Sequence, residues 1–296
     1  MRLAVSGGEE KSESSDNLSH WVELPGLCCQ AAGGHPEWAD DLTIAWLLFY
    51  IAAHLMDKIQ DQDDPDPWWR ERGTGAALSA ATGLFFTASL AINQLNTNSK
   101  TTPVATDIIK SFNNSLLWMA SGQYSDMLGP ACTLQQYWDR AMAKSGSFFG
   151  LACRTGAQLA TRETGQLATF ERYGQHLGLL IQIKDDLDDL QPPPGIGATG
   201  QRPELTSSLP VVYSFEVLQP ELRSRLQQHL EAAPDNAQAA QEVLHLLDQS
   251  GAAVYMLVEM ERHQQLAIQA IQEAALPSDA RSRLEDLVNG LSISGR

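Results

Sequence analysis

Four aspartates lie together at the end of a mostly apolar run in the second half of the chain. Residues 178–183 lead, after one lysine, into Asp185, Asp186, Asp188 and Asp189. Residues three or four apart share a face of an α-helix, so Asp185 and Asp189 point the same way, with Asp186 beside them. Like charges at the end of a buried helix repel one another and raise the free energy of the protein. A hard divalent cation such as Mg²⁺ offsets this cost by coordinating the carboxylate oxygens. Two interpretations are open: a solvated acidic helix end, or a magnesium site for a phosphate-bearing substrate.

A second acidic cluster lies upstream, again at the carboxyl end of an apolar helical run. Asp57 and Asp61 are four residues apart and therefore share a helix face. Two bundle helices that each end an inward-facing apolar stripe with paired aspartates can form a cradle for a divalent metal. The presence of both clusters therefore favours the magnesium site over the solvated helix end. We expect the following Asp63, Asp64 and Asp66 to be solvated.

The elements that must position these clusters are helices. Apolar residues recur with helical spacing, and no segment shows the alternation typical of strands. Four prolines and three glycines predict a loop at 191–208. Residues 1–17 predict a flexible lead-in, so residues 18–296 are expected to form a single all-α domain of about ten helices. The expected helices are 21–32, 37–61, 74–95, 103–128, 133–162, 165–190, 211–218, 220–232, 235–250, 251–275 and 278–291.

Composition excludes several classes of function. A net charge of −16 argues against an electrostatic role on nucleic acid or anionic membranes. No apolar run reaches the roughly 20 residues that span a bilayer, and Leu42–Leu55, which contains His54, is better explained as a buried core helix with a core histidine. The start of the chain lacks the features of a secretory signal. Four cysteines without metal-ligand spacing indicate free thiols in a reducing compartment, so we expect a cytoplasmic protein without an integral membrane segment.

Further segments resemble the motifs of the trans-polyprenyl diphosphate synthases, the polyprenyl synthetase family of the isoprenoid synthase superfamily. They follow the family order over roughly residues 20–275. Residues 57–61 resemble the first DDxxD motif, and residues 182–189 resemble FQIxDDxxD, with Ile181 in place of Phe. The intervening and following segments are Gly122-Gln123 with Asp126 (GQxxDL), Lys144-Ser145 (KT), Gly156-Ala157 (GA) and Ser208–Tyr213 (TLPVVYA).

The resemblance implies a bundle of about ten helices around a central cavity, in which three Mg²⁺ ions trigger the ionisation of an allylic diphosphate. It implies that Asp57 and Asp61 ligate two of these ions, and that Asp185, helped by Asp186 and Asp189, ligates the third. The apolar helix faces would form a dry pocket for the prenyl tail, because a carbocation must be shielded from water.

The resemblance also suggests residues that contact the substrate. Lys144 and either Arg70 or Arg72 would contact the diphosphate, and Gln182 would line the site. For each of these an ordinary role is open: the arginines as surface charges, Lys144 as a solvated helix residue, and Gln182 as the partner of a buried backbone group. The GQxxDL segment contributes Gln123 and Asp126 as candidate substrate-binding residues.

Positions one and two turns before Asp57 suggest the length of the prenyl tail. By the family pattern, small residues at Ala52 and Ala53 would admit a tail of C15 to C20 or longer, with Phe49 or Trp46 as the floor. The resemblance further implies a homodimer formed through the long early helices.

Three departures from the family pattern bear on the second substrate. Lys58 replaces the second aspartate of the first motif, and Thr206 stands where the family has a lysine. Residues 17–25, where the family carries a basic segment for isopentenyl diphosphate, contain neither Lys nor Arg. A diphosphate is held by several charge-assisted hydrogen bonds, and losing most of them costs several kcal/mol. These departures argue against ordinary chain elongation.

The sequence therefore predicts a magnesium-dependent class I enzyme that acts on an allylic prenyl diphosphate. Terpene cyclisation and prenyl transfer to an acceptor other than isopentenyl diphosphate are both open. Elongation with isopentenyl diphosphate is the alternative within the family. A non-catalytic regulatory subunit of a prenyl synthase is the alternative outside enzymes, and the preserved Lys144, Gln182 and acidic residues 185–189 weigh against it.

Overall fold

Helices form all the regular structure in the part of the chain that the structure, a computed structural model, describes, which confirms the all-α prediction. The described residues are 21–60, 71–127, 129, 133–188, 207–233, 236–274 and 276–291, without the side chains of Asp126 and Ser278. The α-helices are α2 (Leu24–Ala31), α3 (Asp40–Gln60), α5 (Thr74–Asn93), α6 (Thr102–Met127), α7 (Leu134–Ala141), α8 (Ser147–Gln158), α9 (Thr164–Asp188), α10 (Leu209–Val217), α11 (Pro220–Ala232), α12 (Ala237–Ser250), α13 (Ala252–Glu273) and α14 (Ser278–Asn289).

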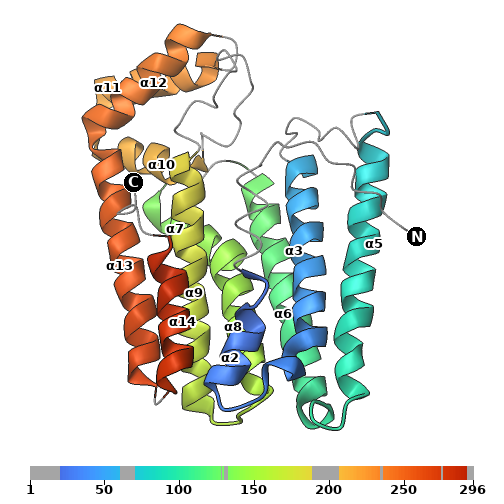
Figure 1. The fold of residues 1–296 in the computed structure, drawn as a ribbon. Helices are drawn as coiled ribbons and strands as arrows, with labels where there is room; N and C mark the ends of the chain where they lie inside the picture. Colours follow the sequence, from blue (N-terminus) through green and yellow to red (C-terminus); the bar gives the residue numbers. More distant parts are fainter. Residues whose placement is uncertain are drawn as a thin grey trace, which may run out of the picture.

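The long helices lie side by side in a bundle (Figure 1). Helix α3 packs along α5, while α9 packs along both α8 and α13, and the short α2 covers α8. Helices α3 and α9 run in the same direction and end at the same end of the bundle, at the top of the view. The two helix ends that the sequence marks as acidic therefore lie at one end of the molecule.

The main core follows the helical spacing of apolar residues. On α3, Leu42, Ala45, Trp46 and Phe49 recur three and four residues apart, and each is almost completely buried. Burying a large apolar side chain stabilises the fold by roughly 1.5–3 kcal/mol. Trp46 stacks on Phe148 of α8 with ring centroids 4.9 Å apart, so this face of α3 is turned towards α8.

A smaller core cluster holds α10, α11 and α12 together. Leu226 of α11, Leu246 of α12 and Val211 of α10 are fully buried in it. In Figure 1, α11 and α12 extend beyond the end of α13, at the same end of the bundle as the acidic helix ends.

The structure differs from the sequence prediction at the expected helix 133–162. A π-helical turn, η3 (Met142–Gly146), separates α7 from α8, and α8 ends at Gln158. A π turn inserts one residue into the helical ladder and leaves no signature in the apolar spacing, so the pattern does not predict it. Short 3₁₀ turns, η1 (Pro36–Ala39) and η2 (Gln94–Asn96), flank two other helices.

Other expectations concern the chain ends, the loop, the thiols and the membrane. The lead-in 1–17 lies outside the described residues, as does the loop 191–208 except for its last two positions. Cys28, Cys29 and Cys153 are buried free thiols, as expected, while Cys132 is outside the described part. Contrary to the expectation that no apolar run could span a bilayer, Pro36–Gln60 and Thr74–Asn96 are long and apolar enough to do so by length and composition alone, as core helices of soluble proteins also can be.

Candidate active site

The π turn η3 connects the two acidic helix ends. Lys144 Nζ donates a hydrogen bond to Asp57 Oδ1 of α3 at 3.1 Å. The hydroxyl of the next residue, Ser145, donates to Gln182 Oε1 of α9 at 2.8 Å. Consecutive residues of one irregular turn therefore hold α3 on one side and α9 on the other. Such π turns occur often at functional sites because they redirect side chains that a regular helix would align.

Glycines explain why α9 lies so close to η3 and α8. A Cβ atom at Gly178 would overlap the carbonyl oxygen of Ser145, and one at Gly174 would overlap that of Phe149. Only glycine allows two backbones to approach in this way. Gln182 lies one turn beyond Gly178, which places its amide within reach of the Ser145 hydroxyl.

The carboxylates of Asp57 and Asp185 are accessible to a ligand. The Asp57 side chain is 37% exposed, and Asp185 is exposed. Burial raises the pKa of Tyr50 on α3, and the nearby Asp185 carboxylate raises this pKa further. This electrostatic contact shows that Asp185 lies near α3. Mg²⁺ prefers carboxylate oxygens as ligands. Asp57 and Asp185 offer accessible carboxylates, and the Asp57 carboxylate already interacts with a positive charge, that of Lys144. Asp57 and Asp185 therefore fit a hard cation.

Asp186 has a different environment. It is only 6% exposed, and its Oδ2 accepts hydrogen bonds from the Tyr137 hydroxyl and from the Leu209 backbone N–H, both at 2.7 Å. Its Oδ1 accepts from Gln182 Nε2 at 3.1 Å. Burial and the adjacent Asp186 raise the pKa of Tyr137 well above its ordinary value, so the hydroxyl remains a donor. Assistance to metal binding by Asp186 stays a prediction, and these bonds favour an anchoring role instead.

Gln123 of α6 lies beside the same turn. A Cβ atom on the preceding Gly122 would be 3.1 Å from Ala143 Cβ, so α6 packs tightly on η3 here. Both the nitrogen and the oxygen of the Gln123 amide are buried and find no hydrogen-bond partner among the described residues. A buried amide without a partner is costly, and a bound polar ligand removes that cost. This observation supports the substrate-binding role expected for Gln123.

Aromatic side chains fill the space below Asp57. Phe49 is 4% exposed and packs against Phe85, Phe112 and Phe148, with ring centroids 5.0–6.0 Å apart. Ala52 is fully buried and Ala53 is half-buried. Sequence reasoning missed Phe148, although its position one turn after Lys144 on the same helical segment was a usable signal. The role of Phe49 or Trp46 as the floor of a prenyl pocket stays a prediction.

Several expected site residues cannot be placed. Asp61, Arg70, Asp189 and the side chain of Asp126 lie outside the described part of the chain, as do Asp63, Asp64, Asp66 and Thr206. Arg72 is exposed in the turn before α5. Within the described ranges, no cluster of three His, Cys, Asp or Glu side chains forms a complete metal site. Of the five expected ligands, the structure describes Asp57, Asp185 and Asp186.

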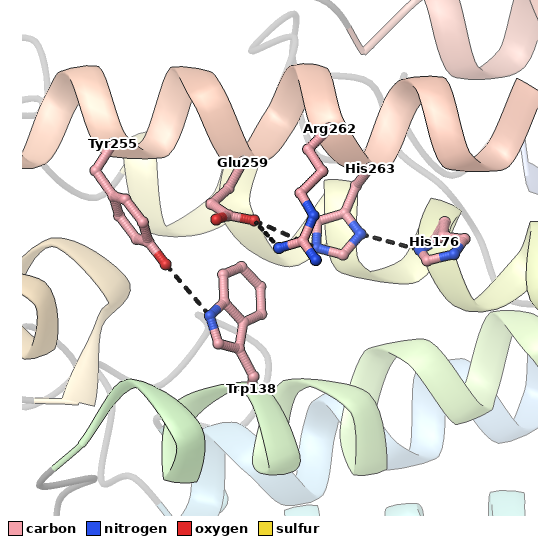
Figure 2. A network of polar contacts seen from close by, with 6 residues as sticks. All are labelled: Trp138, His176, Tyr255, Glu259, Arg262 and His263. Atoms are coloured by element: carbon pink, nitrogen blue, oxygen red, sulfur yellow. Dashed lines mark hydrogen bonds and ion pairs between the residues drawn. The ribbon is translucent and has the colours of Figure 1, made fainter.

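A second polar cluster lies between α7, α9 and α13 (Figure 2). His176 Nδ1 and His263 Nδ1 are 3.0 Å apart, and Glu259 pairs with Arg262 at 3.2 Å and with His263 at 3.9 Å. Burial lowers the pKa of His263 to about 4, helped by His176 and Arg262, and burial also lowers the pKa of His176. Both imidazoles are therefore neutral at pH 7. We call this cluster the histidine network; its members are Trp138, His176, Tyr255, Glu259, Arg262 and His263.

Comparisons with known proteins find relatives of this chain by sequence. The family model described as polyprenyl synthetase matches residues 26–247. The geranylgeranyl diphosphate synthase of Mycobacterium tuberculosis H37Rv is 29% identical over 173 residues, which are 56% of this chain and 48% of that protein. The tryptophan prenyltransferase ComQ of Bacillus subtilis subsp. natto is 27% identical over 139 residues, 47% of this chain and 41% of that protein. The matched part of the chain thus spans about half the length of these curated relatives.

Solved structures share the fold. The polyprenyl synthetase of Streptomyces coelicolor A3(2) aligns with a TM-score of 0.78 at 23% identity, over 92% of this chain and 84% of that one. The geranylgeranyl pyrophosphate synthetase of Pyrococcus horikoshii Ot3 aligns with a TM-score of 0.79 at 21% identity, over 94% and 85%. At such identities the likeness establishes the helical architecture and not the reaction.

Proposed function

This chain belongs to the polyprenyl synthetase family, and from that premise we propose that it is a magnesium-dependent prenyltransferase that passes an allylic prenyl group to an acceptor other than isopentenyl diphosphate. The observation that carries the proposal is the link from Asp57 through Lys144 and Ser145 to Gln182. This link puts a cation and an amide between the two acidic helix ends, where a diphosphate needs them.

The residues of this site would bind the diphosphate and orient it. Lys144 would donate to the phosphate oxygens, and the partnerless amide of Gln123 would supply a further polar contact. Asp57 and Asp185, with Asp61 and Asp189, would hold the magnesium ions, of which the family resemblance suggests three. Bound magnesium would neutralise the charge that builds up on the departing diphosphate.

The bond changes balance without a further reactant. The allylic C–O bond breaks and its electron pair leaves with the diphosphate. An electron pair of the acceptor forms the new bond to the allylic carbon, and the acceptor then loses a proton. Phe49, Phe148 and Trp46 would keep water away from the cation, and their ring faces stabilise positive charge.

The identity of the acceptor is inferred from the start of the described chain. Trp21 is buried against Phe149, with ring centroids 5.8 Å apart, and Leu24 and Pro25 are buried in α2. No Lys or Arg occurs in residues 17–25 to hold a second diphosphate. The relative named tryptophan prenyltransferase supports an aromatic amino-acid side chain as the acceptor.

Terpene cyclisation is the second candidate, and the aromatic cluster below Asp57 favours it. The rings of Trp46 and Phe49, which both pack on Phe148, could stabilise a cation that moves along a folded prenyl chain. Cyclisation needs no acceptor, so the two candidates differ in what must be added to the reaction.

The deciding experiment incubates the protein and Mg²⁺ with geranyl, farnesyl or geranylgeranyl diphosphate, with tails of C15 to C20 expected to be preferred. Each reaction is run alone, with isopentenyl diphosphate, or with tryptophan-containing peptides, and products are identified by mass spectrometry. A prenylated peptide supports the transfer proposal, and cyclic products without an acceptor support cyclisation. Longer linear diphosphates would contradict both and indicate elongation. No product in any reaction, with tight binding to a prenyl synthase from the same source, would indicate a regulatory subunit.

We also propose that two copies associate through α5 and α6. Large apolar side chains there are strongly exposed: Phe86 at 68%, Leu90 at 69%, Leu117 at 71% and Trp118 at 52%. Exposed apolar patches of this kind mark interaction surfaces. Light scattering should give twice the chain mass, and a Leu90→Asp, Leu117→Asp variant should give the mass of one chain.

The buried free thiols support a reducing, cytoplasmic setting.

A further inference from the structure

A continuous chain of hydrogen bonds runs through the acidic end of α9. The Ser145 hydroxyl donates to Gln182 Oε1, and Gln182 Nε2 donates to Asp186 Oδ1. The Tyr137 hydroxyl and the Leu209 backbone N–H both donate to Asp186 Oδ2. The chain joins α7, η3, α9 and α10, and Asp186 is the acceptor on which it converges.

Asp186 also serves the start of α10. The Ser208 side chain makes no capping bond to the first turn of this helix, and the Leu209 N–H instead donates to the Asp186 carboxylate. A negative charge at a helix N-terminus is stabilising, because the backbone dipoles and unpaired N–H groups there are positive. A residue of α9 thus acts as the cap of a helix that begins 21 positions after α9 ends.

The neighbouring Asp185 differs from Asp186 in its accessibility. It is exposed, whereas Asp186 is 6% exposed. Successive helical residues point about 100° apart, so one carboxylate faces protein donors while the other is available to ligands. Coordination of a metal through Oδ2 would compete with two hydrogen bonds of 2.7 Å, and coordination through Oδ1 would compete with the bond from Gln182 Nε2 at 3.1 Å.

We propose that Asp186 is an internal anchor rather than a metal ligand, and that Tyr137 is the positioning residue that holds it. The anchor fixes Gln182 and, through Ser145, the turn that carries Lys144. The positioning part of this inference rests on the proposed diphosphate-binding function. The anchoring part rests on the hydrogen bonds alone.

Adjacent substitutions at 185 and 186 separate the two roles. An asparagine at 186 can keep the hydrogen bonds: its oxygen accepts from Tyr137 and Leu209, and its NH₂ donates to Gln182 after that amide flips. Asp186→Asn should therefore retain binding of magnesium and inorganic pyrophosphate within about threefold in isothermal titration. Asp185→Asn should weaken this binding at least tenfold. Asp186→Ala, which loses the acceptor, should lower the melting temperature by about 5 °C and also weaken binding.

A double-mutant cycle tests the contact between Tyr137 and Asp186 without reference to activity. Tyr137→Phe should lower the melting temperature in the wild-type background but change it little in the Asp186→Ala background, because the hydrogen-bond partner is then absent. In the wild-type background Tyr137→Phe should also weaken pyrophosphate binding about threefold, measured well below the melting temperature.

Two results would overturn the proposal. One is a loss of magnesium–pyrophosphate binding in Asp186→Asn as large as in Asp185→Asn, which would make Asp186 a ligand. The other is an additive effect of Tyr137→Phe and Asp186→Ala on the melting temperature. If the wild-type protein binds no magnesium–pyrophosphate, the proposed function and the positioning role both fail. The melting temperatures still decide whether Asp186 is an anchor.

Discussion

Helix α9 contributes to two polar clusters of different character. The acidic site contains Asp57, Lys144, Gln182 and Asp185, and the histidine network is drawn in Figure 2. In the network, each of the six side chains has a partner within it, and both imidazoles are neutral. At the acidic site, two carboxylates remain accessible, and the amide of Gln123 beside it finds no partner among the described residues.

The difference teaches which observation marks a functional site. The histidine pKa values that are shifted downward occur in the network, yet every one of its side chains already has a partner within it. Shifted pKa values accompany structural networks as well as active sites. The combination of accessible carboxylates with the partnerless amide of Gln123 is the better indicator here, and it occurs beside η3. Single buried polar atoms without a partner among the described residues also occur at Gln60, Gln158 and Arg281.

The largest effect is expected at the acidic site. Asp57→Asn removes one carboxylate charge while keeping the size of the side chain, so the turnover of prenyl diphosphate should fall about a thousandfold, which corresponds to roughly 4 kcal/mol of transition-state stabilisation. The melting temperature should fall by only about 2 °C, because the asparagine oxygen can still accept the hydrogen bond from Lys144. The matched control from the network is Tyr255→Phe, which should keep full activity. Equal losses of activity in both variants would erase the distinction between the clusters.

The next effect is on stability and belongs to the histidine network. The folded-state pKa of His263 is about 4, below the ordinary 6.5, so the unfolded chain binds a proton at higher pH than the folded chain does. The stabilisation is complete above pH 6.5 and is lost as pH falls towards 4, by about 3 kcal/mol. Urea unfolding at pH 7, 5.5 and 4 measures it.

The control for this pH dependence is His263→Gln, which cannot take up the proton. It should be less stable than the wild type at pH 7 and show a shallower loss of stability on acidification. A pH profile parallel to that of the wild type would mean that other groups cause the loss.

Substitution of Lys144 is expected to change two binding affinities in opposite directions, by smaller amounts. Because its Nζ donates to Asp57, it competes with a metal ion for that carboxylate. Lys144→Met should raise the affinity for magnesium alone two- to fivefold, as suits a partly exposed ion pair. It should lower the affinity for pyrophosphate with magnesium about tenfold, or 1.4 kcal/mol. Isothermal titration measures both, and a change of the same sign in both would contradict the competition.

The smallest effect is expected from the edge of the histidine network. Trp138 Nε1 donates to the Tyr255 hydroxyl over 3.4 Å, and the Tyr255 ring stacks on Tyr213 with centroids 4.3 Å apart. Tyr255→Phe keeps the stacking but loses the long hydrogen bond from Trp138 and the interaction of the hydroxyl with Glu259, so the free energy of unfolding should fall by about 1 kcal/mol. A loss several times larger in urea unfolding would show that the hydroxyl does more than make these two interactions.

Much of the helical architecture could be predicted from the sequence, because apolar spacing and the positions of Pro and Gly report helices directly. The helix predicted at 74–95 is observed as α5 with the short turn η2, and the helix at 220–232 is observed with the same bounds. The π turn η3 could not be predicted, since one extra residue does not alter composition. It is nevertheless the turn that aims Lys144 and Ser145 in different directions.

The acidic site was predictable in part. The position of the α3 and α9 ends at the same end of the bundle followed from two similar patterns at two helix ends, and the joint binding of metal by Asp57 and Asp185 stays a prediction. The contrast between Asp185 and Asp186 did not, because adjacent identical residues differ only in what the rest of the fold places beside them. The partner Tyr137 lies 49 residues from Asp186, and no spacing rule connects the two.

The glycine contacts of α9 have a consequence for divergence. At Gly174 and Gly178 the joint between α9 and its neighbours consists of main-chain atoms, which every homologous chain possesses regardless of its side chains. As long as both glycines are kept, changes in side-chain size elsewhere therefore do not alter the distance between η3 and the end of α9 that carries Asp185. Changes in tail length or acceptor preference are therefore expected to accumulate on α3, whose contact with the same turn is made by the side chains of Asp57 and Lys144.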